Sequence, residues 1–244
     1  MKKVAIIFTT LLALIGCKKV SVEPITEEVS ITLSYTLDSS VGSDMTKASD
    51  AEVFDMFYEK MKTGELVAPD YHITFEEVTT GATYEFNGKW DNEDMITIRT
   101  GKYRIKGYSR ASGEYIQDKA SLAFDEEREI SASSRSVVLT AIYDCFLLAF
   151  AKSDIKTMKL YYTYYGDSSA KTFFSLEDYY YAYANDVLYS NQANRKEQAC
   201  ISGARQNGSI FKIYVGNANL EKGKYYIYND VNGSFELPKM EAGK

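Results

Sequence analysis

Two groups of carboxylates are the first candidates for chemistry in this chain. They comprise Asp91, Glu93 and Asp94 after Trp90, and Asp125, Glu126 and Glu127 further on. Grouped carboxylates can bind calcium through their oxygens or supply the acid and the nucleophile of a glycosidase. Neither group has a diagnostic spacing, because the first lacks the EF-hand pattern and glycosidase pairs are defined only in three dimensions. We expect both groups to lie in solvated turns.

The chain contains one histidine, His72, which falls within a predicted strand. A structural zinc site usually takes four ligands, and no second histidine or cysteine lies near His72 in the sequence. The chain also lacks the Gly-x-Ser-x-Gly elbow that presents a nucleophilic serine. The sequence therefore points to no metal and no cofactor, and it favours a protein that is not an enzyme.

Tyrosines are the most suggestive surface candidates. Two runs stand out, Tyr161, Tyr162, Tyr164 and Tyr165 in one and Tyr179, Tyr180, Tyr181 and Tyr183 in the other. Neighbours in a strand point to opposite faces, so some of these rings must leave the core. Exposed tyrosines suit a glycan or a protein interface, whereas cross-strand packing is the alternative explanation. The candidate contact residues are Tyr161, Tyr162, Tyr164, Tyr165, Tyr179 and Tyr181.

The amino terminus carries the most specific motif. Lys2 and Lys3 precede the apolar run Val4–Ile15, which is shorter than the roughly 20 residues of a membrane-spanning helix. This pattern is typical of a secretory signal. The segment Leu14-Ile15-Gly16-Cys17 resembles the bacterial lipobox, which implies cleavage after residue 16 and lipidation of Cys17 with fatty acyl chains such as palmitate. An ordinary signal peptide with a coincidental cysteine is the alternative.

Composition narrows the class of protein. The chain has 244 residues, is 45% hydrophobic and 14% aromatic, and contains 21 tyrosines, which favours β structure with an ample core. Its net charge of −6 becomes −8 once Lys2 and Lys3 leave with the signal. An acidic surface disfavours nucleic acid as a partner. Lys18 follows the lipidated cysteine, at the position where an Asp would retain a lipoprotein in the inner membrane. We therefore expect an outer-membrane location, on either the periplasmic or the outer-surface face.

Two cysteines remain after lipidation, Cys145 and Cys200. An oxidising envelope would allow a disulfide between them. Cys145 opens the run Cys145–Phe150, which reads as a buried strand, and a free thiol behaves there as a small apolar group. We therefore favour free thiols and leave a disulfide as the alternative.

The beginning of the mature chain divides into four parts. Residues 17–28 are polar and aperiodic and read as a tether. Val29–Leu37 alternates apolar and polar residues, which predicts a strand with one buried face. Asp38–Lys47 reads as an exposed loop. A helix over residues 50–62 follows, with a capping box from Ser49 to Glu52, and it should end near Gly64 and lie against a sheet or cap one end of it.

In the rest of the chain, turn residues separate short apolar segments at the spacing typical of a β protein. The predicted strands are Tyr71–Val78, Thr83–Phe86, Met95–Thr100, Lys102–Arg110, Lys119–Phe124, Arg128–Ala132, Arg135–Ile142, Cys145–Ala151, Ile155–Tyr165, Lys171–Phe174, Val187–Tyr189, Gln198–Ser202, Ser209–Val215, Gly223–Asn229 and Gly233–Leu237. Ser175–Tyr181 is assigned to a short helix as an alternative to a strand. This spacing predicts two tandem antiparallel β-sandwich modules, over residues 29–150 and 153–240, with one interlocked domain as the alternative.

Several short motifs together resemble a known family. They are the lipobox, the loop containing Thr46-Lys47-Ala48, the repeated Gly-Lys-Tyr at residues 101–103 and 223–225, and the hydrophobic strand at Cys145–Phe150. In this layout the chain resembles the fimbrillin-type surface lipoproteins of Gram-negative gut and oral anaerobes. That resemblance implies two transthyretin-like β-sandwich domains and, in polymerising members, trimming after an Arg or Lys so that strands exchange between subunits. Lys47 is the candidate trimming site. The helix predicted directly after it is a difference from the main shaft subunits of this family.

The functional expectation follows from these features. The favoured hypothesis is a lipid-anchored, non-enzymatic envelope protein of the fimbrillin-like class. It would act in adhesion or as a component or anchor of a pilus. Its partners would be the membrane, through the lipid, and other pilus subunits or surface glycans. The alternative is a glycan-binding surface lipoprotein of a polysaccharide uptake system. A glycosidase is the third and least favoured reading.

Overall fold

The fold is mainly β, as predicted, with one short helix among the described residues. The computed structural model describes residues 27–40, 48–90, 94–110, 116–153, 155–162, 170–184, 199–215, 219–228, 235 and 237. The elements run β1 (Glu28–Leu37), α1 (Ala48–Lys62), β2 (Asp70–Glu77), β3 (Thr83–Lys89), β4 (Met95–Arg99), β5 (Gly101–Ser109), β6 (Ile116–Gln117), β7 (Leu122–Ile130), β8 (Ser136–Tyr143), β9 (Phe146–Ala151), β10 (Ile155–Tyr162), β11 (Lys171–Thr172), β12 (Phe174–Leu176), β13 (Tyr179–Ala184), β14 (Ala199–Arg205), β15 (Ile210–Tyr214) and β16 (Tyr225–Tyr228).

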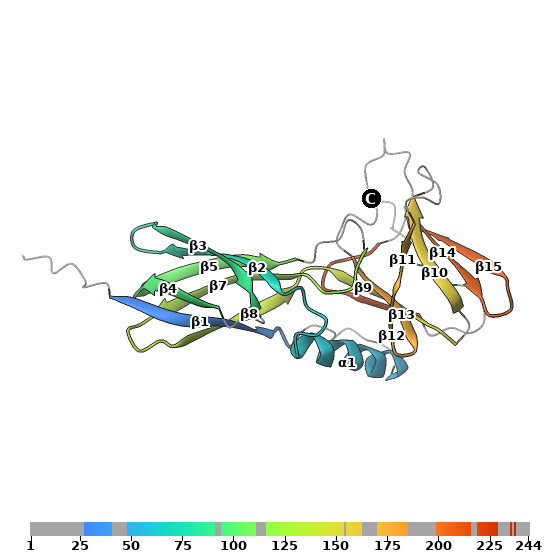
Figure 1. The fold of residues 1–244 in the computed structure, drawn as a ribbon, viewed down its shortest axis with the longest axis horizontal. Coiled ribbons are helices and arrows are strands. Elements are labelled where there is room, and N and C mark those ends of the chain that lie inside the picture. Colours follow the sequence, from blue (N-terminus) through green and yellow to red (C-terminus); the bar gives the residue numbers. More distant parts are fainter. Residues whose placement is uncertain are drawn as a thin grey trace, which may run out of the picture.

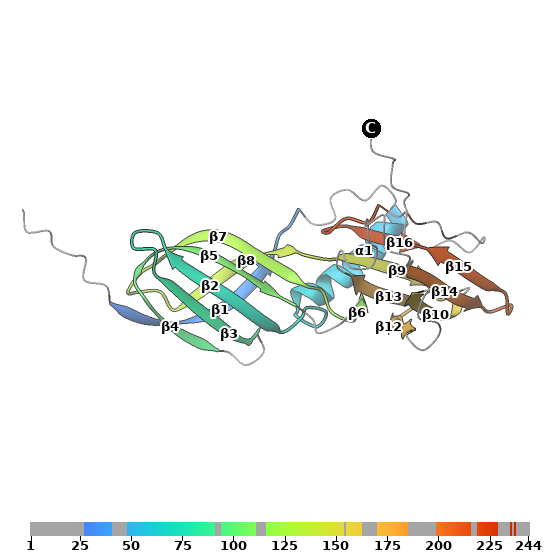
Figure 2. The same ribbon diagram turned by 90° about the horizontal axis from the view of Figure 1, so that it is seen from above.

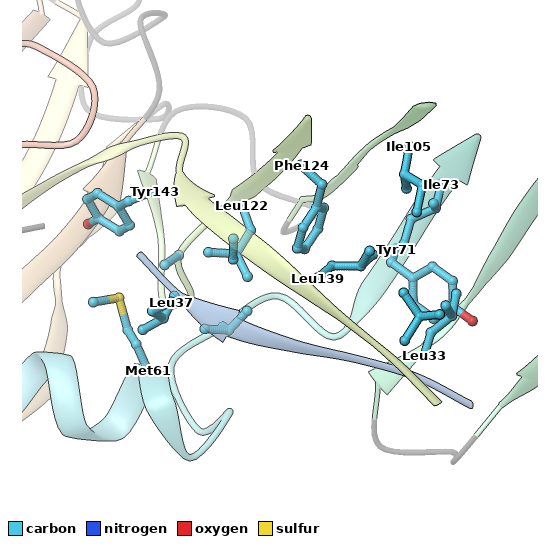
Figure 3. Packing of buried hydrophobic residues seen from close by; sticks show 14 of the residues in the cluster. Leu33, Leu37, Met61, Tyr71, Ile73, Ile105, Leu122, Phe124, Leu139 and Tyr143 are labelled. Carbon is cyan, nitrogen blue, oxygen red and sulfur yellow. The ribbon is translucent and has the colours of Figure 1, made fainter. Parts of the chain in front are cut away.

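A seven-stranded sheet in the order β3-β2-β5-β7-β8-β1-β4 forms the first lobe (Figure 1). Strands β7 and β8 share only the pairs Leu122↔Tyr143 and Ala123↔Ile142, so the sheet turns a corner there and folds over itself. Figure 3 shows the outcome, with Leu33 and Leu139 on one layer packed towards the side chains of the other. All pairs in this sheet are antiparallel except β1 with β8, which is parallel.

Two smaller sheets form the second lobe (Figure 2). One has the order β12-β13-β9-β16, with β6 added beside β13, and the other has the order β11-β10-β14-β15. Strand β16 runs parallel to β9, and the remaining pairs are antiparallel. The second Gly-Lys-Tyr motif leads into β16 just as the first leads into β5, so both motifs open a strand.

Strand β9 joins the two lobes because both of its faces are buried. Leu147 and Ala149 belong to the hydrophobic cluster of the first lobe. Phe146, Leu148 and Phe150 belong to the cluster between the two smaller sheets. The prediction of a fully buried strand here is confirmed, since these residues are 0% exposed. A continuous apolar run is what burial on two faces requires.

The consecutive strands β8 and β9 belong to different sheets. Strand β8 pairs within the seven-stranded sheet, whereas β9 pairs with β13 and β16. The module boundaries expected from the sequence, 29–150 and 153–240, stay a prediction. The signal at 1–16 and the tether at 17–28 also stay predictions. The signal lies outside the described residues, and only residues 27 and 28 of the tether are described.

Helix α1 forms where the sequence predicts it, and it lies against a sheet. Its apolar side chains Phe54 and Phe57 pack on β16 and β13, with ring centroids 4.4 Å from Tyr225 and 5.3 Å from Tyr181. Met61 at the end of the helix is fully buried. The helix stops before Gly64, whose φ of +82° is the left-handed conformation of a helix C-terminus.

One predicted turn is wrong. Asp125, Glu126 and Glu127 lie in the middle of β7, a single strand that replaces the two predicted strands Lys119–Phe124 and Arg128–Ala132. Their charges are matched across the ladder to β5, where Lys102 is 2.6 Å from Glu127 and Lys106 is 4.0 Å from Asp125. Opposite charges on facing strands stabilise a strand whose composition alone suggests a turn.

The short helix considered for Ser175–Tyr181 is also wrong. The segment forms the end of β12, a tight turn and the start of β13, with Phe174 opposite Tyr181. Glu177 in the turn has a φ of +45°. Strand β13 also pairs along its whole length with β9, and this tertiary ladder favours a strand over a helix.

Candidate functional site: the first strand and its seat

Strand β1 is an internal strand of the seven-stranded sheet, although it is the first of the described elements. It pairs antiparallel with β4 from Glu28↔Arg99 to Thr32↔Met95. It pairs parallel with β8 from Thr32↔Ser136 to Leu37↔Ala141. We call the edges of β4 and β8, with the apolar side chains behind them, the first-strand seat. The amino-terminal half of β1 is held by one wall of this seat and the carboxyl-terminal half by the other.

Apolar packing anchors β1 in the seat, as the alternating pattern predicts. The exposed fractions are 7% for Val29, 0% for Ile31, 5% for Leu33 and 7% for Leu37. Figure 3 shows Leu33 and Leu37 directed into the core between the layers. Burying one such side chain contributes about 1.5–3 kcal/mol. The four together therefore hold β1 with a free energy comparable to the whole stability of a domain, about 5–15 kcal/mol.

Tyr35 occupies the fifth inward position and ties β1 to the helix. Its hydroxyl donates to the carbonyl of Met61 at 3.5 Å. Burial raises the pKa of Tyr35 to about 12. Gly64 lies beside this hydroxyl, and its left-handed backbone is one that residues with a side chain rarely adopt.

Trp90 closes the seat on the side of β2 and β3, a role that the sequence analysis did not assign to it. Its ring lies 4.4 Å from that of Tyr71 and 5.1 Å from that of Tyr35, centroid to centroid. Its backbone N–H donates to the carbonyl of Pro69 at 3.0 Å. The only available signal was that the chain has a single tryptophan, which the sequence places just before an acidic group.

The predicted processing residues flank β1 in the sequence. Cys17 and Lys47 lie outside the described residues, so their lipidation and trimming remain predictions. Their order along the chain is nevertheless informative. Lys47 immediately precedes α1, which begins at Ala48 and packs on the second lobe. A cut after Lys47 would therefore separate β1 from the body and leave α1 attached to it.

Beneath α1, three tyrosine hydroxyls converge in the interior. Those of Tyr143, Tyr183 and Tyr225 are buried and have no hydrogen-bond partner among the described residues. The rings of Tyr143 and Tyr225 stack at 5.1 Å, and burial raises the pKa of all three phenols. Burial likewise raises the pKa of the Cys145 thiol to about 12. These groups are neutral and unreactive at physiological pH.

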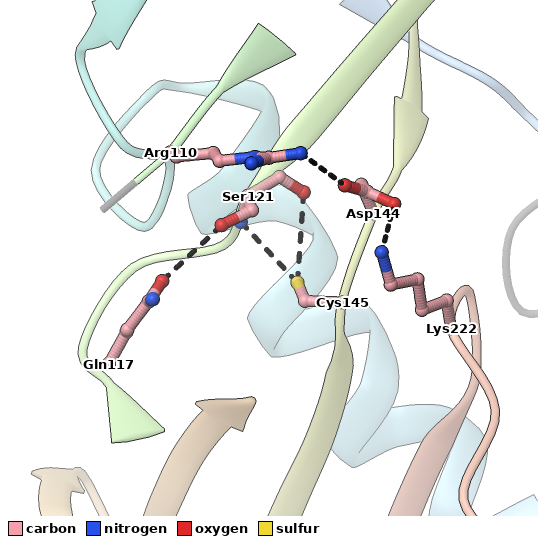
Figure 4. Close-up of polar contacts among 6 residues, drawn as sticks. All are labelled: Arg110, Gln117, Ser121, Asp144, Cys145 and Lys222. Carbon is pink, nitrogen blue, oxygen red and sulfur yellow. Dashed lines mark hydrogen bonds and ion pairs between the residues drawn. The ribbon is translucent and has the colours of Figure 1, made fainter. Parts of the chain in front are cut away.

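The junction between the lobes is held by polar contacts around Asp144 and Cys145 (Figure 4). The Asp144 carboxylate lies 2.8 Å from Lys222 of the second lobe and 3.9 Å from Arg110 of the first. The backbone N–H of Ser121 donates to the Cys145 sulfur at 3.4 Å. Cys145 and Cys200 are both buried free thiols, so the disulfide considered above is not formed.

The tyrosines proposed as contact residues are only partly described. Tyr181 is 5% exposed, packs on Phe57 and donates its hydroxyl to the carbonyl of Asp118 at 3.0 Å. Tyr179 is half-buried and lies 6.5 Å from Phe57, ring to ring. Tyr161 and Tyr162 lie in β10, but their side chains are outside the description, as are Tyr164 and Tyr165 altogether. A contact role for this set stays a prediction.

The remaining chemical candidates are placed as follows. His72 lies on an open sheet face, with its Nδ1 2.7 Å from Oδ1 of Asn87 and its ring 5.3 Å from Tyr108. Asp94 accepts from the backbone N–H of Lys89 at 3.1 Å, while Asp91 and Glu93 lie outside the described residues. In the described part of the chain, no group of three His, Cys, Asp or Glu residues could hold a metal ion.

Within the described ranges, no helix has the length and apolar character needed to cross a bilayer. No protein-family model and no curated protein sequence matches the chain.

Several solved structures of fimbrial and adhesin proteins are similar to the chain. A fimbrial assembly protein from Parabacteroides distasonis has a TM-score of 0.39 at 9% identity, covering 83% of this chain and 90% of its own. A candidate cell adhesion protein from Bacteroides fragilis has a TM-score of 0.39 at 10% identity, with coverages of 72% and 87%. The tip fimbrial protein Mfa3 from Porphyromonas gingivalis, truncated at its C-terminus, has a TM-score of 0.36 at 6% identity, with coverages of 61% and 76%.

Proposed function

We propose that this chain is a lipid-anchored, non-enzymatic protein of the cell envelope, of the fimbrillin-like class, that acts in adhesion or as a component or anchor of a surface filament. The observation that carries the proposal is the position of β1. The strand nearest the lipidation motif fills a slot between β4 and β8, and the loop with the candidate trimming site follows it directly.

The mechanism would be main-chain strand addition. Loss of β1 leaves unpaired N–H and C=O groups on β4 and β8, and such open edges pair readily with another extended chain. It also uncovers the apolar side chains behind the seat, among them Ile96 and Leu139, which are 6% and 0% exposed in the intact chain. A strand from another subunit would restore both the ladder and the burial.

Trimming decides between two roles in this proposal. An intact chain keeps the lipid at Cys17 joined through β1 to the body, which suits a fixed anchor in the outer membrane. A chain cut after Lys47 loses that connection, because only the seat contacts of β1 would still hold the lipid. Once β1 leaves its seat, for example by exchange with a strand of another subunit, the cut chain would be a mobile subunit with an open seat.

The test combines acyl labelling with controlled trimming. Cells expressing the full chain are fed an alkyne-bearing palmitate, and label should appear on the wild type and be absent from Cys17→Ala. The purified chain is then treated with a Lys-specific protease, and the cut is mapped by mass spectrometry. We expect cleavage after Lys47 followed by assembly into larger species on size-exclusion chromatography. Lys47→Gln should block both steps, whereas the matched control Lys62→Gln, at an exposed helix position, should block neither.

Two results would overturn the strand-addition part of the proposal. One is a trimmed chain that stays monomeric when incubated with a peptide of residues 28–37 or with other subunits. The other is assembly that proceeds equally well in Lys47→Gln with β1 still in its seat. Palmitate label that persists in Cys17→Ala would overturn the anchor.

A further inference from the structure

A hollow of about 320 Å³ opens beside β1, where the middle of the strand meets the end of α1. Its polar and aromatic lining is Ser34, Tyr35, Lys62, Thr63, Trp90 and Lys119. The volume is at the lower end of the range of roughly 300–1,000 Å³ usual for small-molecule sites, which suits one sugar-sized unit.

The charge of this hollow is opposite to that of the protein. The chain has a net charge of −6, yet the described residues that line the hollow include two lysines and no carboxylate. Lys62 lies 2.8 Å from Glu59 of the same helix, so part of its charge is already matched. Lys119 has no ion pair among the described residues. An anion is therefore favoured here, with Lys119 as its main counter-charge.

The indole of Trp90 gives the hollow a second recognition element. Its ring is held by Tyr71 and Tyr35 and by Phe124, whose centroid is 5.7 Å away. Its Nε1–H is buried and has no acceptor among the described residues. This N–H has essentially no exposed surface, so the ring contributes apolar surface that is already held in place at the hollow.

Taken together, the polar lining is rich in donors. The Lys119 ammonium and the Ser34 hydroxyl can both donate, and the two aromatic rings offer apolar surface beside them. The complementary ligand has many acceptor oxygens, one negative charge and a ring with an apolar C–H face. We propose that this hollow binds one carboxylated pyranose unit, such as a uronic acid or a sialic acid at the end of a surface glycan.

This site is separate from the tyrosines considered as glycan contacts in the sequence, and strand addition does not require it. Failure of sugar binding would leave the trimming and assembly experiment unaffected. Conversely, a chain that never assembles could still bind the sugar, because the hollow is complete in the intact chain with β1 in place.

The unique tryptophan makes the test specific to the site. The full chain is titrated with methyl β-D-glucuronide, and with N-acetylneuraminic acid to distinguish the two sources, while emission from Trp90 is followed. We expect a saturable change with a Kd of about 1 mM or tighter, from the usual ligand efficiency of small ligands. Methyl β-D-glucoside, which has the same ring without the carboxylate, should bind at least about tenfold more weakly.

Variants connect the signal to the proposed contacts. Lys119→Gln should weaken glucuronide binding by about tenfold or more, with circular dichroism showing an unchanged fold. The matched control Lys106→Gln removes a lysine from the outer sheet face and should leave the affinity unchanged. Saturation-transfer NMR on Trp90→Phe, which keeps a smaller ring and therefore less apolar surface at the hollow, should show weaker binding than wild type.

Three results would overturn the proposal. The first is equal affinity for the glucuronide and the glucoside, which would remove the role of the charge. The second is binding that is unchanged in Lys119→Gln or absent for both acidic sugars. The third is benzoate binding as tightly as the glucuronide, which would show that the hollow selects any ring carboxylate instead of a sugar.

Discussion

Replacing Ile31 by alanine tests how strongly β1 is held in its seat. Ile31 is 0% exposed and lies opposite Ile96 of β4. The change removes three buried carbons, worth about 2.4 kcal/mol in transfer free energy. A residual cavity adds to this, so we expect a loss of about 3–4 kcal/mol in the free energy of unfolding. That is a large part of the stability of a typical domain.

The measurement is urea unfolding followed by the emission of Trp90. This side chain packs against Tyr35 of β1 and Phe124 of β7, so it reports on the lobe that contains the seat. With a slope of about 2 kcal/mol per molar urea, the unfolding midpoint should fall by roughly 1.5–2 M. The control is Thr36→Val, which changes an exposed position on the same strand and should shift the free energy by less than about 0.5 kcal/mol.

A midpoint for Ile31→Ala that matches the Thr36→Val midpoint would refute the reasoning. It would mean that the emission of Trp90 changes without unfolding of the seat, or that β1 contributes little to the lobe. Native-state amide exchange separates these cases, because the β1 amides should be among the well-protected ones in the wild type and lose protection selectively in Ile31→Ala.

Three further predictions concern other parts of the molecule. Burial raises the pKa of the Cys145 thiol from 9.0 to about 12, so between these pH values the folded chain keeps a proton that the unfolded chain releases. This contribution to the free energy of unfolding is complete below pH 9 and is lost as the pH rises towards 12. Alkylation of native Cys145 at neutral pH would contradict this prediction. Asp144→Asn should cost about 1 kcal/mol in thermal unfolding, because its partners are half-exposed, and the difference should shrink at high salt. Gly107→Ala should cost at least about 2 kcal/mol, since its Cβ would lie 2.5 Å from the His72 carbonyl oxygen. Gly81→Ala meets nothing within 4 Å and should cost only about 1 kcal/mol for its φ of +72°; equal losses for the two glycines would show that close packing is not the cause.

Local patterns predicted several features correctly. The alternation over Val29–Leu37 predicted β1 and its buried face to within one residue. The apolar spacing and Gly64 predicted α1 and its end. These features depend on neighbouring residues alone, which is why a single sequence suffices for them.

The two wrong assignments share a physical cause. The acidic run in β7 reads as a turn until the basic residues of β5 are placed opposite it. By its sequence the segment at 175–181 could form a short helix or a strand, and β9 favours the strand because it supplies a ladder for β13. In both cases a strand is stabilised by a partner that is distant in the sequence.

The sequence by itself determined that the chain is mainly β, that it carries one helix after its first strand, and where its apolar faces lie, because these follow from residue type and period. Only the tertiary structure decided that β1 is an internal strand between β4 and β8, that β9 is buried by both lobes, and that Trp90 and Lys119 meet at one hollow. Strand order and register depend on contacts between residues far apart in the chain, and one sequence does not encode these contacts in any local pattern. For this reason the seat of β1 and the hollow beside it became visible only in the folded molecule.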